Sequence, residues 1–152
     1  MSGRKLFGSS ADQRLNIAVI IIIFAGVTIY TLFHPSTAFG LAFGDDSMTI
    51  TGPDGAPFAV TVSYEDILSV SQTDSLEIGT RLEGLSTDSC RFGTWENESY
   101  GSYTLCAVPS ISNYIVLETR EGMVAFNYES ADTTSRLYAA LLDLLEDHGQ
   151  EA

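Results

Sequence analysis

Cations are scarce in this chain of 152 residues, and those present are unevenly placed. Only seven lysines and arginines stand against twenty acidic residues, and Lys5 is the sole lysine. Beyond residue 33 the cations are Arg81, Arg91, Arg120 and Arg136, whereas all acids except Asp12 lie there. A surface this acidic repels phosphate backbones and anionic headgroups, which excludes nucleic-acid binding. It also argues against electrostatic docking of this part on a membrane.

Histidine is nearly as rare as lysine, because the chain has only His34 and His148. A serine or cysteine nucleophile needs a base on a rigid scaffold, and these two positions flank the folded part of the chain. Two cysteines without a nearby histidine cannot complete a zinc shell, and no acidic loop has calcium-type spacing. We therefore predict a protein that is not an enzyme, with no catalytic, cofactor-binding or metal-binding residues.

One long hydrophobic run, residues 15–33, carries no charge. As a helix it would span about 28 Å, close to the thickness of a bilayer's hydrocarbon core. Cations flank it on the amino side only, at Arg4, Lys5 and Arg14, and such cations stay cytoplasmic. The pattern predicts a single-pass cell-membrane protein with a cytoplasmic leader (1–14), a transmembrane helix (15–33), a linker (34–44) and an extracytoplasmic domain (45–149).

A cleaved signal peptide is the alternative interpretation of the same run. Small residues at 36–38 offer a cleavage-like pattern, and the leader is basic. We favour a retained anchor because the run exceeds the usual apolar region of a signal peptide, about 7–15 residues. Both interpretations place the carboxy-terminal part outside the cytoplasm.

The only two cysteines, Cys90 and Cys106, fall in this external part. A β-hairpin centred on Glu98 would place them directly opposite each other, where Cβ atoms lie about 4.5–5.5 Å apart. An oxidising compartment permits a disulfide at such a pair. We predict this bridge, and two buried free thiols are the alternative.

Periodicity beyond residue 44 predicts mostly β-structure with one helix. We expect a hairpin of residues 47–51 and 58–63, a helical turn at 64–67, a strand at 68–72, a loop at 74–88, the cysteine hairpin, and a last hairpin of 113–119 and 123–128. Residues 130–148 have an apolar stripe at helical spacing, formed by Leu137, Ala140, Leu141, Leu144 and Leu145. This acidic amphipathic helix is better suited to closing a β-barrel than to lying on a membrane.

The order of these elements resembles the bacterial PH domain family. The likeness lies in residues 62–70, with a Tyr-x-Asp-Ile turn between two strands, in 79–81, 89–93 and 114–119, and in Gly122, Phe126 and Asn127. It implies a mainly β (α+β) fold, a PH-like bent antiparallel β-barrel closed by the carboxy-terminal helix. Lipid-binding PH domains carry cations in the first hairpin loop, but residues 51–56 have none. The departure argues against phosphoinositide binding.

The sequence thus predicts a non-enzymatic module whose partners are the membrane, through the amino-terminal helix, and another protein or a second copy of itself. A sheet edge or the loop at 74–88 is the expected docking surface. The alternative is a cell-envelope carrier or enzyme that binds a lipid or a small apolar molecule inside the barrel.

Overall fold

The computed structural model describes residues 40–53 and 59–147. The chain divides into two units, Met1–Ser36 and Thr37–Ala152, and the described residues all belong to the second. The predicted transmembrane helix (15–33) and both histidines lie outside the described residues. Within the described part, no helix is long and apolar enough to cross a membrane.

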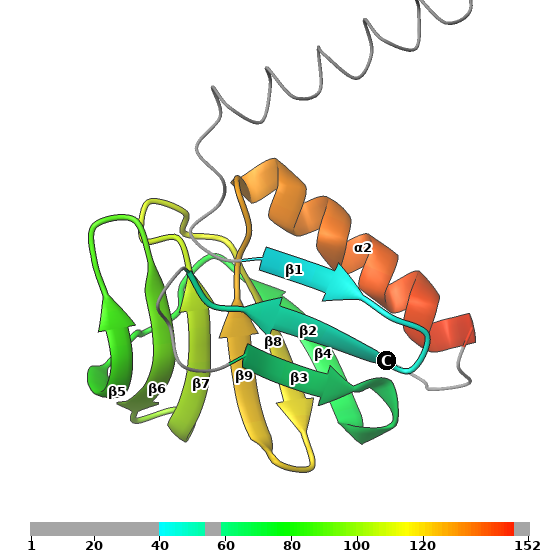
Figure 1. Ribbon diagram of the computed structural model, residues 1–152, viewed down its shortest axis with the longest axis horizontal. Coiled ribbons are helices and arrows are strands. Elements are labelled where there is room, and N and C mark those ends of the chain that lie inside the picture. Colours follow the sequence, from blue (N-terminus) through cyan, green and yellow to red (C-terminus); the bar gives the residue numbers. More distant parts are fainter. Residues whose placement is uncertain (1–39, 54–58, 148–152) are drawn as a thin grey trace, which may run out of the picture. The chain divides into compact units, whose positions relative to one another are not determined.

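The described strands form two sheets. The first has the order β1-β2-β3 and comprises β1 (Gly40–Phe43), β2 (Ser47–Thr51) and β3 (Ala59–Ser63). The second has the order β4-β8-β9-β7-β6-β5 and comprises β4 (Ile67–Thr73), β5 (Thr80–Ser86), β6 (Arg91–Asn97), β7 (Gly101–Ala107), β8 (Tyr114–Thr119) and β9 (Gly122–Phe126). A 3₁₀ turn, η1 (Tyr64–Asp66), joins the sheets, and the small sheet crosses in front of β4, β8 and β9 (Figure 1).

One face of the six-stranded sheet, its inner face, carries the main hydrophobic core. The small sheet contributes Met48, Ile50 and Val62 to this core, and the carboxy-terminal helix α2 (Ala131–Asp147) contributes Leu141 and Leu145. The predicted helix is confirmed, with one difference in its stripe, because Ala140 is exposed and Tyr138 packs on the core instead. The β2–β3 hairpin, η1, β4 and the β8–β9 hairpin also lie where the sequence predicts them. Phe58, expected to face the core from β3, lies outside the described residues.

The other face of the six-stranded sheet, its outer face, is covered by a strap, residues 74–79. Because β4 and β5 are opposite edges of the sheet, the chain between them must cross from one side to the other. Leu76 and Ile78 pack on a second buried cluster that includes Trp95 and Tyr103. The Asn97 side chain donates to the carbonyl oxygen of Glu77 (2.6 Å), and the Tyr103 hydroxyl donates to that of Ile78 (2.8 Å).

Three sequence-based expectations about this architecture are wrong. Residues 80–86 of the expected loop form β5, whose seven residues are all exposed, so no alternation of buried and exposed residues marks the strand. Residues 40–43 of the expected linker form β1. The described strands do not close into a barrel, and β7 pairs with β9 in parallel. The sheets contact each other through their apolar faces rather than through a shared hydrogen-bond ladder.

Two glycines allow β5 and β6 to approach closely. Gly84 and Gly93 are directly paired, and both have positive φ (104° and 140°). A Cβ atom on Gly93 would run into the carbonyl oxygen of Glu83, and one on Gly84 into that of Phe92. Both positions therefore exclude a side chain for steric as well as conformational reasons.

We expect the Gly93→Ala variant to lower the free energy of unfolding by about 2 kcal/mol or more, because strain and a backbone clash add together. Gly101→Ala is the matched control, since Gly101 also has positive φ (66°) but open space around it. The control should cost about 1 kcal/mol. Urea denaturation measures both, and equal losses would contradict the close approach.

Candidate functional site

A groove of about 450 Å³ runs along the edge of β3 that no described strand pairs with. It is lined by Val60, Thr61, Val62, Ser63, Asp66, Thr94, Ser102, Tyr103, Thr104, Thr119, Glu121, Gly122, Met123 and Val124. β3 forms one wall of the groove. Its other edge pairs with β2, so the edge on the groove side is the one that no described strand covers. The inner face of the six-stranded sheet provides the floor, so both sheets contribute to the hollow.

The groove lies where β7 and β9 separate. Their parallel pairing covers only three residue pairs, from Thr104–Val124 to Cys106–Phe126. Before these pairs, and among the described strands, β7 is hydrogen-bonded only to β6 and β9 only to β8. Residues at the start of both strands, Ser102 and Met123 among them, line the hollow that this separation leaves.

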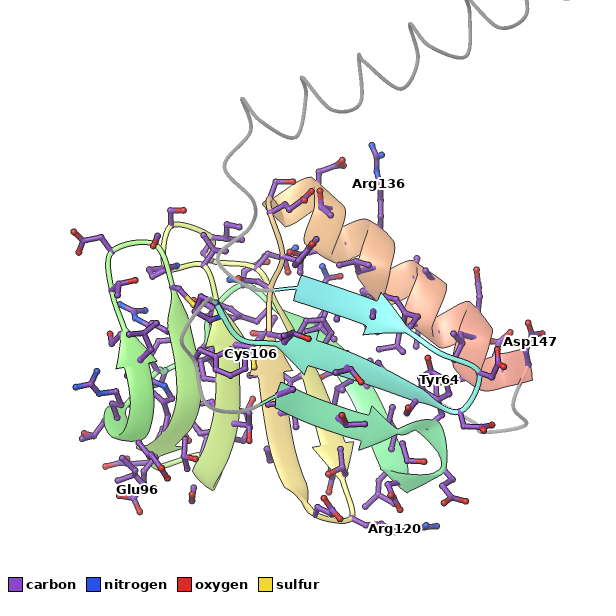
Figure 2. All side chains as sticks on the ribbon, viewed as in Figure 1. Tyr64, Glu96, Cys106, Arg120, Arg136 and Asp147 are labelled. Carbon is purple, nitrogen blue, oxygen red and sulfur yellow. The ribbon has the colours of Figure 1, made fainter. Side chains whose placement is uncertain are left out.

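Polarity changes stepwise along the inner face of the β6–β7 hairpin. The pair Phe92–Cys106 is fully buried in the core. Next along the face, the pair Thr94–Thr104 is half-buried, and the pair Glu96–Ser102 is exposed. Figure 2 shows the Glu96 side chain at the end of β6, next to the turn that leads to β7. This gradient marks the point where the face leaves the core and enters the groove.

Sequence reasoning missed these groove residues. The available signal was two threonines and a serine, Thr94, Thr104 and Ser102, at positions that share a strand face with buried residues. Interpreting it requires knowing where β7 and β9 stop pairing, which depends on contacts between segments far apart in the chain. The groove walls consequently present hydroxyl groups and valine side chains, and none of the described residues that line them is a lysine, arginine or histidine.

An ion pair closes one end of the groove. The Arg120 guanidinium lies 3.1 Å from the Asp66 carboxylate, and the Arg120 backbone N–H donates to the Asp66 carbonyl oxygen (2.9 Å). Arg120 lies in the β8–β9 turn, at the bottom of Figure 2. The pair fixes this turn against η1, but the Arg120 side chain is 62% exposed, so the charge contact itself adds little stability. The neighbouring Glu121 adds a negative charge to the groove.

A second hollow lies between the end of α2 and the β1–β2 turn. It is lined by Gly44, Asp45, Ala140, Asp143, Leu144 and Asp147. Three of its six residues are acidic, and Asp147 stands at the end of the helix in Figure 2. The last turn of α2 has no basic residue, so the carbonyl groups at this helix end add to the negative potential there.

The predicted disulfide pair lies on one strand face but not in direct opposition. The β6–β7 register is centred on Ser99 rather than Glu98, so Phe92 pairs with Cys106 and Cys90 is diagonal to it. Both cysteines are buried and free in the structure. Burial raises the pKa of both thiols, and the neighbouring Cys90 raises that of Cys106 further. The directly opposed pairing is therefore wrong, and the bridge itself stays a prediction.

The part of the chain that the structure describes contains no group of histidine, cysteine or acidic residues able to hold a metal ion. The acidic residues of the groove, Asp66 and Glu121, have no histidine or lysine beside them among its described lining residues. The groove therefore offers hydrogen-bonding groups and negative charge rather than a nucleophile, and its chemistry is suited to binding.

We expect the full-length protein from an oxidising compartment to contain a bond between Cys90 and Cys106. Thiol titration after denaturation without a reductant measures this. A bridge leaves no reactive thiols, whereas a count of two contradicts it. In the reduced, folded protein Cys106 should react slowly, because burial disfavours its thiolate.

Tyr103, which secures the strap, should make stability fall in alkaline solution. Burial is the main cause that raises the pKa of its phenol to about 12 from 10.0. Between these values the unfolded chain loses the proton first, so the free energy of unfolding falls as pH rises from about 10 to 12. The Tyr103→Phe variant should show a shallower fall, together with a loss of about 1 kcal/mol at neutral pH because the hydrogen bond to the strap is absent. Urea denaturation at a series of alkaline pH values provides the test, and parallel profiles would contradict it.

Comparison with known proteins agrees with this architecture. No curated protein and no solved structure matches the chain significantly. The model of one family, described as the bacterial PH domain, matches residues 42–134, which is more than half of the chain. This span runs from β1 into the first turn of α2 and includes every groove-lining residue. The chain belongs to the bacterial PH domain family.

Proposed function

We propose that the chain is a membrane-anchored, extracytoplasmic, non-enzymatic interaction module that docks another protein in the groove along β3. The main support for this proposal is the groove itself, an open hollow beside a strand edge that no described strand covers, in a domain of the PH type. PH-like domains are interaction modules, and fold alone does not say what they bind. The choice of a protein partner rests on the site.

The composition of the groove supports a protein rather than an anionic lipid. Its ionisable lining residues, Asp66 and Glu121, are acidic, apart from the buried phenol of Tyr103. Among the described arginines, Arg120 is paired with Asp66 and Arg136 with Asp132 (2.8 Å). A phosphorylated headgroup would therefore meet repulsion at the groove without a compensating cation.

An apolar ligand inside the domain has less support. The space between the sheets is filled by buried side chains such as Ile115, Leu117 and Phe126. The groove is open and lined by hydroxyl groups, which suit hydrogen bonding better than the burial of a lipid chain.

Site-specific photo-crosslinking in intact membranes tests the proposal. A photoreactive residue at Ser102, inside the groove, should yield one discrete protein adduct. The same residue at Asp88, which is exposed but outside the groove, is the matched control and should not yield it. Combining Val60→Trp with the photoreactive residue at Ser102 should abolish the adduct, because the half-buried Val60 side chain faces the groove from β3 and an indole there would fill it. No protein adduct at Ser102, or a lipid adduct instead, would overturn the proposal.

A further inference from the structure

Among the described strands, the backbone of β3 has one free edge, and the pairing with β2 identifies which groups lie on it. The Tyr64 N–H donates to the Asp46 carbonyl oxygen (3.0 Å), so this pair is hydrogen-bonded. In an antiparallel ladder hydrogen-bonded and non-hydrogen-bonded pairs alternate. Val62 and Val60 therefore also bond to β2, whereas the N–H and C=O of Thr61 and the N–H of Ser63 point to the free edge.

These outward groups open onto the groove. Thr61 and Ser63 both line it, and within the described residues no backbone hydrogen bond to another element uses the N–H or C=O of Thr61 or the N–H of Ser63. The Ser63 C=O differs, because Ser63 is the N-cap of η1 and its carbonyl serves the first bond of that turn. The edge is regular, because the β2–β3 register runs through all five residues of β3 without a bulge. It therefore presents evenly spaced donors and acceptors, the arrangement that an added strand requires.

The edges of the larger sheet lack this regularity. β5 has a bulge between Arg81 and Glu83, and these two charged residues flank the exposed Leu82. β4 has a bulge between Ile67 and Ser69. Bulges and charges of this kind are devices by which proteins prevent pairing at an edge. Compared with these two edges, β3 is the unprotected one.

Charge indicates what kind of strand would add. Asp66 and Glu121 lie at the Ser63 end of the groove, and the chain as a whole is strongly acidic. A segment that carries lysine or arginine would be attracted to the groove and could pair with Glu121, since Asp66 is already paired with Arg120. Its other side chains would alternate between the valines of the groove and the solvent, because strand side chains point to opposite faces in turn.

We infer that the groove binds an extended, cationic peptide segment of a partner protein, which adds to β3 as a fourth strand of the small sheet. This inference rests on the proposed function and names the class of partner. The segment bonds through its backbone to Thr61 and Ser63, and its lysine or arginine lies near Glu121. A strand of about five residues matches the length of β3.

Phage-displayed random dodecapeptides, selected on the full-length protein in detergent, provide the probe. We expect the selected peptides to be enriched in lysine and arginine and to bind more weakly at high salt. A synthetic peptide from this selection should bind the Thr61→Pro variant about tenfold more weakly or worse, because proline has no N–H to donate. The matched control Thr61→Ala retains the backbone and should bind about as tightly as the wild type.

Hydrogen exchange gives a second readout that needs no variant. The amides of Thr61 and Ser63 should gain protection when the peptide binds, whereas those of Val60 and Val62 should already be protected without it. If the Thr61→Pro variant unfolds at a temperature near that of the Thr61→Ala control, its fold is intact. Its loss of binding is then due to the missing N–H at the edge of β3. If this variant does not fold, the exchange pattern decides alone.

Three outcomes would overturn the strand addition: failure to select any cationic peptide, equal binding to a folded Thr61→Pro variant, or protection confined to other strands. The crosslinking at Ser102 separates this failure from that of the proposed function. If a protein adduct persists in the Thr61→Pro variant, the result supports docking in the groove but rejects the added strand. The absence of any adduct rejects the proposed function itself.

Discussion

The apolar layer between the two sheets is the constraint on which the rest of this structure depends. The small sheet and α2 are held on the inner face of the larger sheet by side chains, among them Met48, Phe126 and Leu145. Non-directional packing of this kind needs no shared ladder of hydrogen bonds. The described sheets therefore join without closing, and β3 keeps one edge that no described strand pairs with. The groove is a direct result of packing two sheets face to face.

The elements with strong local signals could be predicted from the sequence. The β2–β3 and β8–β9 hairpins alternate or are continuously apolar between turn residues, and α2 carries a clear apolar stripe. Local patterns of this kind depend on residues close together in the chain. They also supplied the resemblance to the bacterial PH domain family, which the family match confirms.

The candidate site could not be predicted, because it depends on long-range pairing. β5 has no buried residue that would mark it as a strand, and only its pairing with β6 defines it. The register of the cysteine hairpin shifts by two residues when its centre moves from Glu98 to Ser99. That shift changes which side chains are opposite each other, Cys90 and Cys106 among them, although it leaves each side chain on the same face. The parallel contact of β7 with β9 joins segments that no sequence periodicity relates.

The short β7–β9 ladder also divides the larger sheet into two halves that few hydrogen bonds connect. The meander β5-β6-β7 and the block β4-β8-β9 meet through only three residue pairs. The strap spans both halves, since it starts at β4 and is bonded to Asn97 of β6 and Tyr103 of β7. The strap therefore links the two halves across the outer face, and the halves can separate only after these two side chains release it. Opening of the larger sheet would thus couple its two faces, because release of the strap on the outer face and spreading of the groove floor on the inner face would accompany each other.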